Sequence, residues 1–551
     1  MRMFLRDAIA DVLKQEGVRH VFGQTGSHVC SAWEGVVRAG GISTILNRQE
    51  GNGAYMADAY SRLSKRPGVV IGTTGPGLAN MTSALANAYV ESTALVVFGS
   101  GVPPHLAGRN ALQDGSGRGR SPSQAAMLRG VTKLVITVPT AEAGPTAARE
   151  AFRTALSGRP GPVVVEISEP FWDQEVEYQS LKPAQYRSSS VCPCDPAESA
   201  ALVSRLFEAR RPVVLVGEGA DEVAGTGYLM EALRALGLPF LVAPLAKSLV
   251  DEYDPLCVST LRQMFTAAAV QPGYQLIREA DVVLLLGSRL QEFQIQIDPS
   301  CLEGSMLLQV DPDPDEIGRV FPVHGSVVGS VSSFVAALRG RRHPAADVAS
   351  KRVDALRADS PRRGGLQAEA DGIHIMNIYS VVEKVAPADA VIVLGAGLTK
   401  FLGVGALRTA AGQHLLVADS YGPMGYEVPA AMGAALATGR PVICVTGDGS
   451  FQMTCNELGT LMNHPSAKVV YLVTNNGGQA SMFRWVKKRF GKHHDFDLWK
   501  NPNFRTLAAA YGLHGQGAES SSQLQTVLGT ALAAETSSII EARIDPSSWR
   551  T

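Results

Sequence analysis

One stretch decides the fold: VICVTGDGSFQMTCNELGTLMNHPSAKVVYLVTNNGG, which runs from Val442 to Gly478. A β-branched run opens it and ends in Gly447-Asp448-Gly449-Ser450, after which a helical pattern continues to about Met462. A second β run, Val469 to Thr474, ends in Asn475-Asn476-Gly477-Gly478. This order of strand, tight turn, helix, strand and tight turn predicts a βαβ unit of a parallel sheet.

The polar residues of this stretch lie at the strand ends, where α/β proteins bind their ligands. Asp448 offers a carboxylate, Asn476 an amide oxygen and Gly478 a backbone carbonyl. Together these oxygens suit Mg²⁺, with water or phosphate oxygens in the remaining positions. The glycines let backbone N–H groups approach a diphosphate closely. The alternative is an ordinary βα turn in which Asp448 caps a helix and the second strand ends in a polar loop.

The two halves resemble the signature of the thiamine diphosphate (ThDP) enzymes, which is GDG followed one βα unit later by NN. Here Asn476 lies 28 residues after Asp448. The resemblance implies that Asp448, Asn476 and Gly478 bind the metal. It also implies that further residues of the two turns border the cofactor: Gly447, Gly449, Ser450 and Gln479.

The chain has 551 residues, of which 45% are hydrophobic and 18% charged, so it can bury large cores. At roughly 100–200 residues per domain, this length predicts about three domains. Strands alternate with helices throughout, and we expect an α/β protein of three doubly wound parallel-sheet domains. With the resemblance, these are a pyrimidine-binding domain at 1–175, a central domain at 195–340 and a diphosphate-binding domain at 370–551. The basic stretch from 339 to 363 is expected to be a solvated linker.

Glu50 follows a strand near the N-terminus and opens a helix rich in Ala and Gly. By itself, a glutamate there is explained by the helix dipole, which favours an acid in the first turn. The stretch RQEGNGAYMADAYSR (48–62) resembles the segment in which decarboxylase-type ThDP enzymes carry one glutamate. The resemblance implies that Glu50 hydrogen-bonds ring nitrogen N1′ of the aminopyrimidine, a role suited to a carboxylic acid that keeps its proton near neutral pH.

The stretch SYGPMGYEVPAA (420–431) resembles the family's segment before the diphosphate site. The resemblance implies that Met424 wedges between the two rings of the cofactor and that the carbonyl of Gly422 accepts a hydrogen bond from the 4′ amino group. For any methionine, a buried packing role is the ordinary alternative. A second backbone nest against the diphosphate is expected at Gly395, Ala396, Gly397 and Leu398.

Three further residues are expected to act on the substrate. Ser27 and His28 belong to a loop that faces the thiazolium in this family, although Thr25-Gly26 stands where many relatives have Pro-Gly. Gln113 lies in NALQD (110–114), which resembles the acetolactate-synthase segment whose Gln lies near the substrate. We therefore expect Ser27, His28, Gln113 and Glu50 to be the catalytic residues.

The resemblance covers nearly the whole chain and is closest to the acetolactate synthase-like branch, as SGRPGPVVVE (157–166) and QVDPDPDEIG (309–318) indicate. It implies decarboxylation of a 2-oxo acid followed by capture of a second carbonyl compound, a carboligation. The adjacent histidines typical of pyruvate decarboxylases are absent near Gln113, which favours capture over protonation to an aldehyde. A simple 2-oxo acid decarboxylase and a ThDP lyase acting on an acyl-CoA or a diketone stay open.

In that branch the active site forms between two subunits. Glu50 of one chain would then meet Asp448 and Asn476 of another, so a homodimer is the minimum assembly and a homotetramer is compatible with it. FAD is not expected, because GSRLQEF (287–293) and TLRQM (260–264) depart from the flavin-contact patterns of acetolactate synthases.

Other classes of protein have less support. The net charge of −1 favours neither nucleic acid nor a membrane surface, and no apolar run reaches the ~20 residues of a membrane helix. Seven scattered cysteines and an N-terminus without a signal-peptide pattern suggest a reduced, cytoplasmic protein. The stretch GEGADE (217–222) is half of a dinucleotide fingerprint, so an NAD-dependent dehydrogenase is an alternative, as is a non-catalytic subunit.

Overall fold

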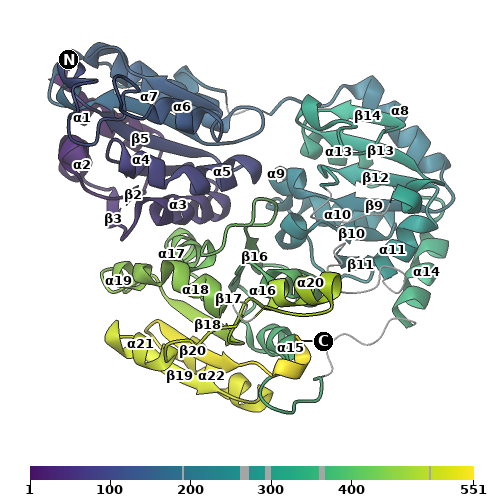
Figure 1. Cartoon of the computed structure of the whole chain (residues 1–551). Helices are drawn as coiled ribbons and strands as arrows, with labels where there is room; N and C mark the ends of the chain where they lie inside the picture. The colour runs from purple at the N-terminus through teal and green to yellow at the C-terminus, as the bar shows by residue number, and fades with distance from the viewer. Residues whose placement is uncertain (189–190, 261–271, 292–298, 359–365, 495–497, 551) are drawn as a thin grey trace.

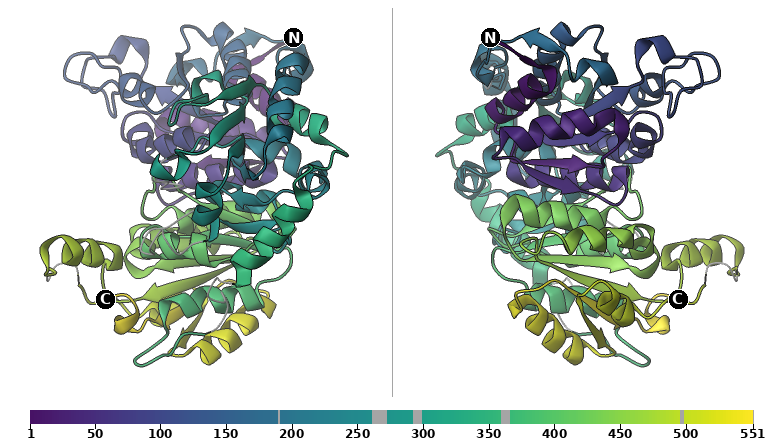
Figure 2. Two further views of the ribbon diagram at one scale, coloured as in Figure 1. Left: turned by 90° about the vertical axis from the view of Figure 1, so that its right-hand side faces the viewer. Right: turned by 90° about the vertical axis from the view of Figure 1, so that its left-hand side faces the viewer.

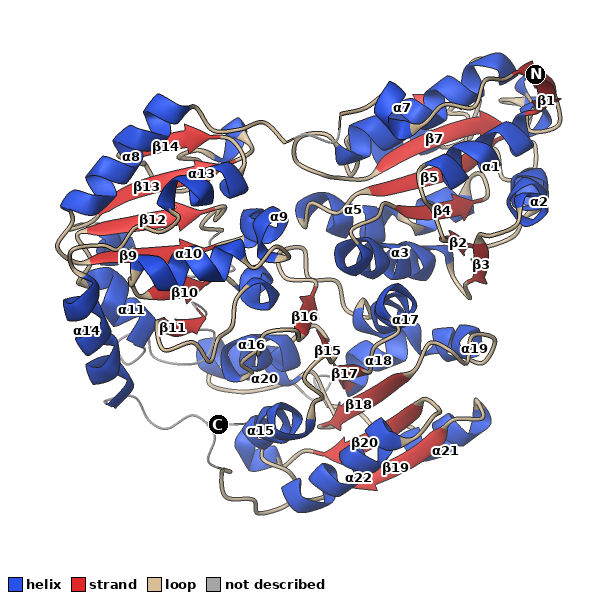
Figure 3. Cartoon of the chain, turned by 180° about the vertical axis from the view of Figure 1, so that it is seen from behind, coloured by secondary structure: helices blue, strands red, loops and turns tan. Residues whose placement is uncertain are grey.

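The computed structural model describes residues 1–188, 191–260, 272–291, 299–358, 366–494 and 498–550. Three α/β domains follow one another along the chain, each built on a six-stranded parallel sheet with helices on its faces (Figures 1 and 3). The predicted fold class is therefore confirmed. A separate two-stranded antiparallel sheet pairs β1 (Arg2–Phe4) with β8 (Glu175–Glu177), so the chain returns to its N-terminus after the first domain.

The N-terminal sheet has the strand order β3-β2-β4-β5-β7-β6. Its strands are β2 (His20–Gly23), β3 (Ser43–Leu46), β4 (Gly68–Gly72), β5 (Leu95–Gly101), β6 (Leu134–Thr137) and β7 (Val163–Ser168). The order reverses between β2 and β4, which places a ligand-binding crevice at their carboxyl ends. The helices are α1 (Leu5–Gln15), α2 (Cys30–Ala39), α3 (Glu50–Ser64), α4 (Pro76–Asn80), α5 (Thr82–Val90), α6 (Gln124–Arg129) and α7 (Gly144–Leu156).

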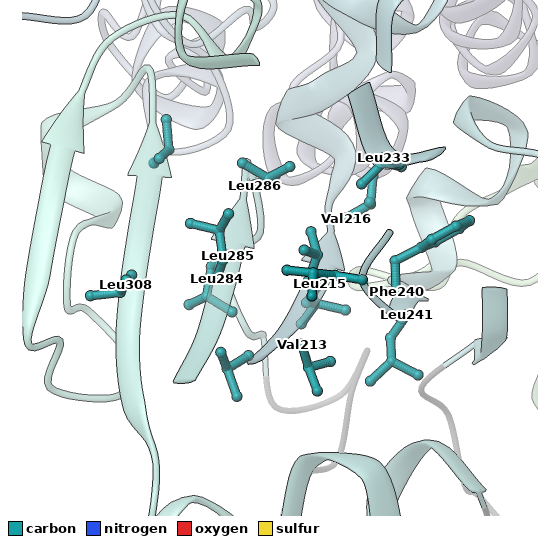
Figure 4. Close-up of a cluster of buried hydrophobic side chains, with 14 of the residues drawn as sticks. Val213, Leu215, Val216, Leu233, Phe240, Leu241, Leu284, Leu285, Leu286 and Leu308 are labelled. Atoms are coloured by element: carbon teal, nitrogen blue, oxygen red, sulfur yellow. The ribbon is translucent and has the colours of Figure 1, made fainter. Parts of the chain in front are cut away.

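The central sheet has the order β11-β10-β9-β12-β13-β14. Runs of Val and Leu buried on both faces form its middle strands, as a sheet covered by helices requires (Figure 4). The strands are β9 (Pro212–Val216), β10 (Phe240–Val242), β11 (Cys257–Thr260), β12 (Val282–Leu286), β13 (Met306–Asp311) and β14 (Gly325–Val328). The helices are α8 (Pro196–Glu208), α9 (Asp221–Ala224), α10 (Tyr228–Leu236), α11 (Pro272–Arg278), α13 (Val331–Leu338) and α14 (Ala346–Ala358).

Helix α14 corrects the prediction of a solvated linker from 339 to 363. Val353 and Leu356 of this helix are buried, and Arg352 pairs with Glu279 of the central domain at 2.9 Å. The charged residues lie on the outer face of an amphipathic helix, and its apolar side covers the central core. The run of charged residues alone did not predict this helix, because few apolar residues stand between the charges.

The C-terminal sheet has the order β16-β15-β17-β18-β20-β19, which repeats the pattern of the N-terminal sheet. Its strands are β15 (Val391–Leu394), β16 (His414–Val417), β17 (Val442–Gly447), β18 (Val469–Asn475), β19 (His514–Ala518) and β20 (Ser538–Arg543). The helices are α15 (Ile375–Val385), α16 (Leu398–Ala406), α17 (Glu427–Thr438), α18 (Asp448–Thr454), α19 (Leu458–Leu461), α20 (Ala480–Phe490), α21 (Phe504–Ala510) and α22 (Ser521–Ala533).

Helices α3 and α17 join the N-terminal and C-terminal domains. A Cβ atom at Gly433 of α17 would lie 2.1 Å from the carbonyl oxygen of Met56 on α3, so only glycine permits this close crossing. One hydrophobic cluster accordingly contains residues of both domains. Figure 2 shows the N-terminal domain seated on the C-terminal domain, with the central domain beside both. Among the described residues, no helix is both long and apolar enough to cross a membrane.

Candidate active site

The carboxyl ends of β17 and β18 bring Asp448, Asn476 and Gly478 into one corner. The two strands pair in parallel with Gly447 opposite Thr474, which sets the two turns side by side. The Asp448 carboxylate accepts hydrogen bonds from the backbone N–H groups of Gly449 and Gly477, both at 2.9 Å. Asn476 Oδ1 accepts from the N–H of Gly478 at 3.0 Å. The GDG turn and the NN turn, which are 28 residues apart in the sequence, thus lie side by side in the structure.

Asp448 is almost fully buried, with an exposed fraction of 2%. Burial raises the pKa of this carboxyl, and hydrogen bonds from Asn501, Gly477 and Gly449 oppose the rise. A carboxylate in such a place is stabilised by a cation beside it. The oxygen donors of Asp448, Asn476 and Gly478 are all hard, so the set fits Mg²⁺. Among the described residues, no group of three or more His, Cys, Asp or Glu side chains is arranged so that it could hold a metal ion.

Two residues at this corner were not predicted from the sequence. Asn501 Nδ2 donates to Asp448 Oδ2 at 2.5 Å and to Asn475 Oδ1 at 2.8 Å. The backbone N–H of Trp499 donates to the carbonyl of Gly477 at 2.9 Å. A Cβ at Gly449 would lie 2.7 Å from the Trp499 ring, so the ring sits directly on the GDG turn. Only the tertiary fold reveals this, because the stretch around Asn501-Pro502 has the composition of an ordinary loop.

The second predicted nest lies beside this corner. Gly397 has a φ of +78°, and Leu398 begins α16 directly after it. A Cβ at Gly397 would lie 3.6 Å from Ser481 Oγ at the start of α20, and one at Gly447 would lie 3.7 Å from Thr399 Oγ1. Gly395, Ala396 and Gly397 therefore border the GDG turn, as a shared diphosphate site requires. Gln479 is exposed at the start of α20.

Glu427 lies beneath this nest. Its Oε1 accepts a hydrogen bond from Thr446 Oγ1 at 2.5 Å and would lie 2.6 Å from a Cβ at Gly395. Burial raises the pKa of Glu427 above its ordinary value.

Met424 lies over the GDG turn. Its Cε is 3.8 Å from the position of a Cβ at Gly449, and 38% of the residue is exposed. The backbone on either side is in the left-handed region, with φ +64° at Gly422 and +83° at Gly425. Ser450 Oγ accepts from the N–H of Gly425 at 2.8 Å, which ties the Met424 segment to α18.

The predicted site residues of the N-terminal domain gather around Thr73 at the end of β4, a residue that the sequence did not single out. A Cβ at Gly26 would lie 2.8 Å from the Thr73 side chain, so the Ser27–His28 loop packs directly on it. Thr73 Oγ1 donates to Gln113 Oε1 at 3.3 Å. On the other side, Glu50 Oε2 accepts from Asn80 Nδ2 at 3.0 Å.

Gln113 has a φ of +57°, which is uncommon for a residue with a side chain. Its carbonyl would lie 2.5 Å from a Cβ at Gly75, so the Gln113 loop is pressed against the turn after β4. Asp114 fixes this loop. Burial opposes its ionisation, but hydrogen bonds from Ser116, Gly108 and Ser121 prevail and lower its pKa to about 2. Strain of this kind is typical of functional loops.

Ser27 and His28 are linked to an acid that was not predicted. Ser27 Oγ and His28 Nδ1 lie 3.2 Å apart, and His28 Nε2 is 3.9 Å from Glu169 Oε2. Ser27 is exposed, whereas His28 is buried. Glu169 belongs to the 3₁₀ turn Glu169–Phe171 that follows β7.

Glu457 connects the two domains close to Glu50. Its Oε1 accepts from the backbone N–H groups of Arg48 and Gln49, at 2.8 and 3.1 Å, and from Asn52 Nδ2 at 3.0 Å. A residue of the C-terminal domain thus holds the backbone that leads into the helix that Glu50 begins, whose N-cap is Gln49.

The predicted residues therefore form two groups within one chain. The N-terminal group contains Ser27, His28, Glu50 and Gln113. The C-terminal group contains Gly395–Leu398, Gly422, Met424, Gly447–Ser450, Asn476 and Gly478. In the described part of the chain, no hydrogen bond or ion pair joins the two groups.

The half fingerprint of the central domain has a packing role. A Cβ at Gly217 would lie 2.3 Å from the carbonyl oxygen of Gly287, and Gly219 also abuts Gly287. Glu218 forms a buried ion pair with Arg289 at the same strand ends. The glycines thus permit close approach of β9 and β12. The stretches used to predict the absence of FAD lie partly outside the described residues, at 261–264 and 292–293. The absence of FAD therefore stays a prediction.

The chain matches three family profiles in order. Residues 3–118 match the thiamine pyrophosphate enzyme N-terminal TPP binding domain, residues 199–338 the central domain and residues 395–542 the C-terminal TPP binding domain. These three matches follow the order of the three sheets described above.

Similar curated proteins cover almost the same length. A probable 2-ketoarginine decarboxylase of Pseudomonas aeruginosa is 30% identical over 522 residues, spanning 92% of this chain and 88% of the relative. A probable acetolactate synthase large subunit of Methanococcus aeolicus is 25% identical, spanning 98% and 92% respectively. The acetolactate synthase isozyme 2 large subunit of Escherichia coli is 26% identical, spanning 98% and 95%.

Proposed function

The chain belongs to the thiamine pyrophosphate enzymes, and from this membership we propose that it decarboxylates a 2-oxo acid and joins the remaining carbon unit to a second carbonyl compound, with ThDP and Mg²⁺ as cofactors. The observation that carries the proposal is the corner at β17 and β18, where Asp448, Asn476 and Gly478 present oxygen donors beside two glycine turns. When bound, ThDP supplies the carbon nucleophile and the electron sink that such a decarboxylation needs.

The residues of the C-terminal group would hold the cofactor. Asp448, Asn476 and the carbonyl of Gly478 bind Mg²⁺, and the N–H groups of the turns at Gly395–Leu398 and Gly447–Ser450 bind the diphosphate. Gln479 borders this site. Met424, which is partly exposed over Gly449, would pack against the cofactor, and the carbonyl of Gly422 would accept a hydrogen bond from the amino group of the aminopyrimidine.

The residues of the N-terminal group would handle protons and substrate. Glu50 shares a proton with the aminopyrimidine ring. Gln113, held in a strained loop, orients the substrate. Ser27 and His28 lie on the same edge, and Glu169 orients the His28 ring for proton movement. Since no hydrogen bond or ion pair joins the two groups among the described residues, we propose a homodimer in which Glu50 of one chain completes the site of the other.

A simple decarboxylase is the second candidate, because the 30% identical relative is a probable 2-ketoarginine decarboxylase. In that case the product is protonated to an aldehyde, and His28 is the group placed to deliver the proton. The two candidates share every residue of the cofactor site and differ only in the last step.

The test is CO₂ release from a panel of 2-oxo acids, including pyruvate, 2-oxobutyrate and 2-ketoarginine, with ThDP and Mg²⁺ added. Wild type and Glu50→Gln are compared, and the product mass is recorded. We expect release that falls by at least about 100-fold in the variant. A product heavier than the aldehyde supports carboligation, whereas the aldehyde itself favours the second candidate. A lack of release with every acid would contradict both.

A further inference from the structure

The segment from 417 to 426, which carries Gly422 and Met424, is held by residues of all three domains. From the N-terminal domain, Arg62 Nη1 donates to the carbonyl of Val417 at 2.8 Å. From the central domain, Gln291 accepts from Ser420 Oγ. Within the C-terminal domain, buried Lys400 donates to the carbonyls of Ala418 and Asp419, at 3.0 and 2.8 Å.

Glu91 makes the most specific of these contacts. It follows the last residue of α5, and its Oε1 accepts from the backbone N–H groups of Asp419 and Ser420, at 2.9 and 2.8 Å. Glu91 is buried, with 7% exposed, and its Oε2 has no hydrogen-bond partner among the described residues. A single oxygen thus satisfies two backbone donors of another domain.

The surroundings show that the acceptor oxygen matters more than the charge. Burial raises the pKa of Glu91 to about 7, opposed by Arg62 and reinforced by Asp419. A proton on Oε2 would leave both hydrogen bonds to Oε1 intact. The group can therefore hold the segment in either protonation state.

We propose that Glu91 is a positioning residue for the cofactor, because it fixes the near end of the 419–425 span while Ser450 and Thr454 fix the far end at Gly425. Between these anchors the chain passes Gly422, whose left-handed backbone sets the direction of the turn. The place of Met424 over Gly449 then depends on the N-terminal domain. The cofactor part of this inference rests on the proposed function.

Two substitutions of similar volume test the inference. Glu91→Gln keeps the acceptor oxygen, whereas Glu91→Met takes this acceptor away from the N–H groups of Asp419 and Ser420. In the protein without cofactor, we expect Met to speed the hydrogen–deuterium exchange of segment 419–420 by at least about tenfold. Gln should stay within about threefold of wild type. Glu91→Asp, which is one methylene too short, should behave like Met and serves if Met does not fold.

The second readout is ThDP affinity, measured by quenching of tryptophan fluorescence at fixed Mg²⁺. We expect at least about tenfold weaker binding for Met and near wild-type binding for Gln. Glu16→Gln and Glu16→Met are the matched controls, since Glu16 is also buried but pairs with Arg187 at 2.7 Å, away from this segment. These controls should leave both readouts unchanged.

Rescue by Gln separates positioning from simple loss of packing. If Met and Gln behave alike in the exchange measurement, or if neither changes it, the inference is wrong. If wild type itself binds no ThDP while exchange follows the expected pattern, the proposed function fails and the role of Glu91 in holding the segment stands.

Discussion

Asp448 is the residue on which the proposed metal site depends most. Its carboxylate is buried at a strand end, and Asn501 donates an amide N–H to it at 2.5 Å. The loop that carries Asn501 thus lies directly against the corner proposed to bind the metal.

Substitution Asp448→Asn tests the metal role. The change removes the only carboxylate of the proposed set while keeping its size, so we expect Mg²⁺-dependent ThDP binding to weaken by more than about tenfold. Fluorescence titration of ThDP at several Mg²⁺ concentrations measures this. Asp389→Asn, at an exposed position of the same domain, is the control. Unchanged dependence on Mg²⁺ in Asp448→Asn would show that the metal binds elsewhere or not at all.

Asp311 carries a pH dependence of stability at the end of β13. Burial raises its pKa to about 7, opposed by the hydrogen bond from Asp313 and by Arg289. Because the folded state holds this proton more tightly than the unfolded state, its stabilising contribution is present at low pH and is lost as pH rises toward about 7. Melting temperatures of wild type and Asp311→Asn between pH 5 and 8.5 measure the effect.

We expect Asp311→Asn to gain stability relative to wild type as pH rises, with the difference levelling off above about pH 7. Asn keeps an acceptor for the N–H of Asp313, which donates to Asp311 Oδ1 at 2.9 Å. A melting-temperature difference that is constant over the whole range would mean that the carboxyl ionises normally.

At the scale of elements, the crossing of α3 and α17 is the contact on which the two cofactor-related domains depend. Gly433→Ala would place a methyl group 2.1 Å from the carbonyl oxygen of Met56. We expect a loss of unfolding free energy of more than about 2 kcal/mol, because backbone rather than a side chain must move. Chemical denaturation with urea measures it.

Gly529 of α22 provides a matched control, since a Cβ there meets nothing within 4 Å. Gly529→Ala should stabilise the protein by about 0.5–1 kcal/mol, through helix propensity alone. Equal effects of the two substitutions would show that the helices separate enough to admit the methyl group of Gly433→Ala.

The elements also show what the sequence can predict and why. Strands with β-branched runs, such as β17 and β18, were predicted within one or two residues of their bounds. β19 was missed because its sequence, HGQGA, has neither β-branched residues nor alternation. The helix expected to reach Met462 is interrupted at Thr454, whose φ of −138° lets its Oγ1 reach the carbonyl of Gly425.

The site was predictable where its residues belong to strand-end turns and unpredictable where only tertiary contact matters. Asp448 and Asn476 can be recognised in the sequence because each stands beside glycine and because 28 residues separate them. No sequence pattern identifies Thr73, Glu169 or Asn501 as site residues. Their partners in the site lie 40 or more residues away in the sequence. Glu91 is equally hidden, because the segment it holds is 328 residues distant.

For the whole molecule, the proposed homodimer rests on the separation of the two groups of site residues. The N-terminal group lies around Thr73 and the C-terminal group around Asp448. The hydrogen bonds that join the two domains are made by other residues, among them Glu457, Glu91 and Arg62. A second chain that offers its own N-terminal group to this C-terminal group would complete two equivalent sites by one two-fold axis.

Complementation tests this arrangement. Glu50→Gln and Asp448→Asn should each be inactive alone. In a dimer that contains one chain of each, one site carries both substitutions and the other carries neither. Random pairing of equal amounts of the two chains should therefore restore about a quarter of the wild-type activity. Refolding the mixed chains and measuring CO₂ release, with each variant refolded alone as control, gives the value. Activity no higher than that of the separate variants would mean that Glu50 serves the Asp448 of its own chain, and the gap between the two groups would then have to close within one molecule.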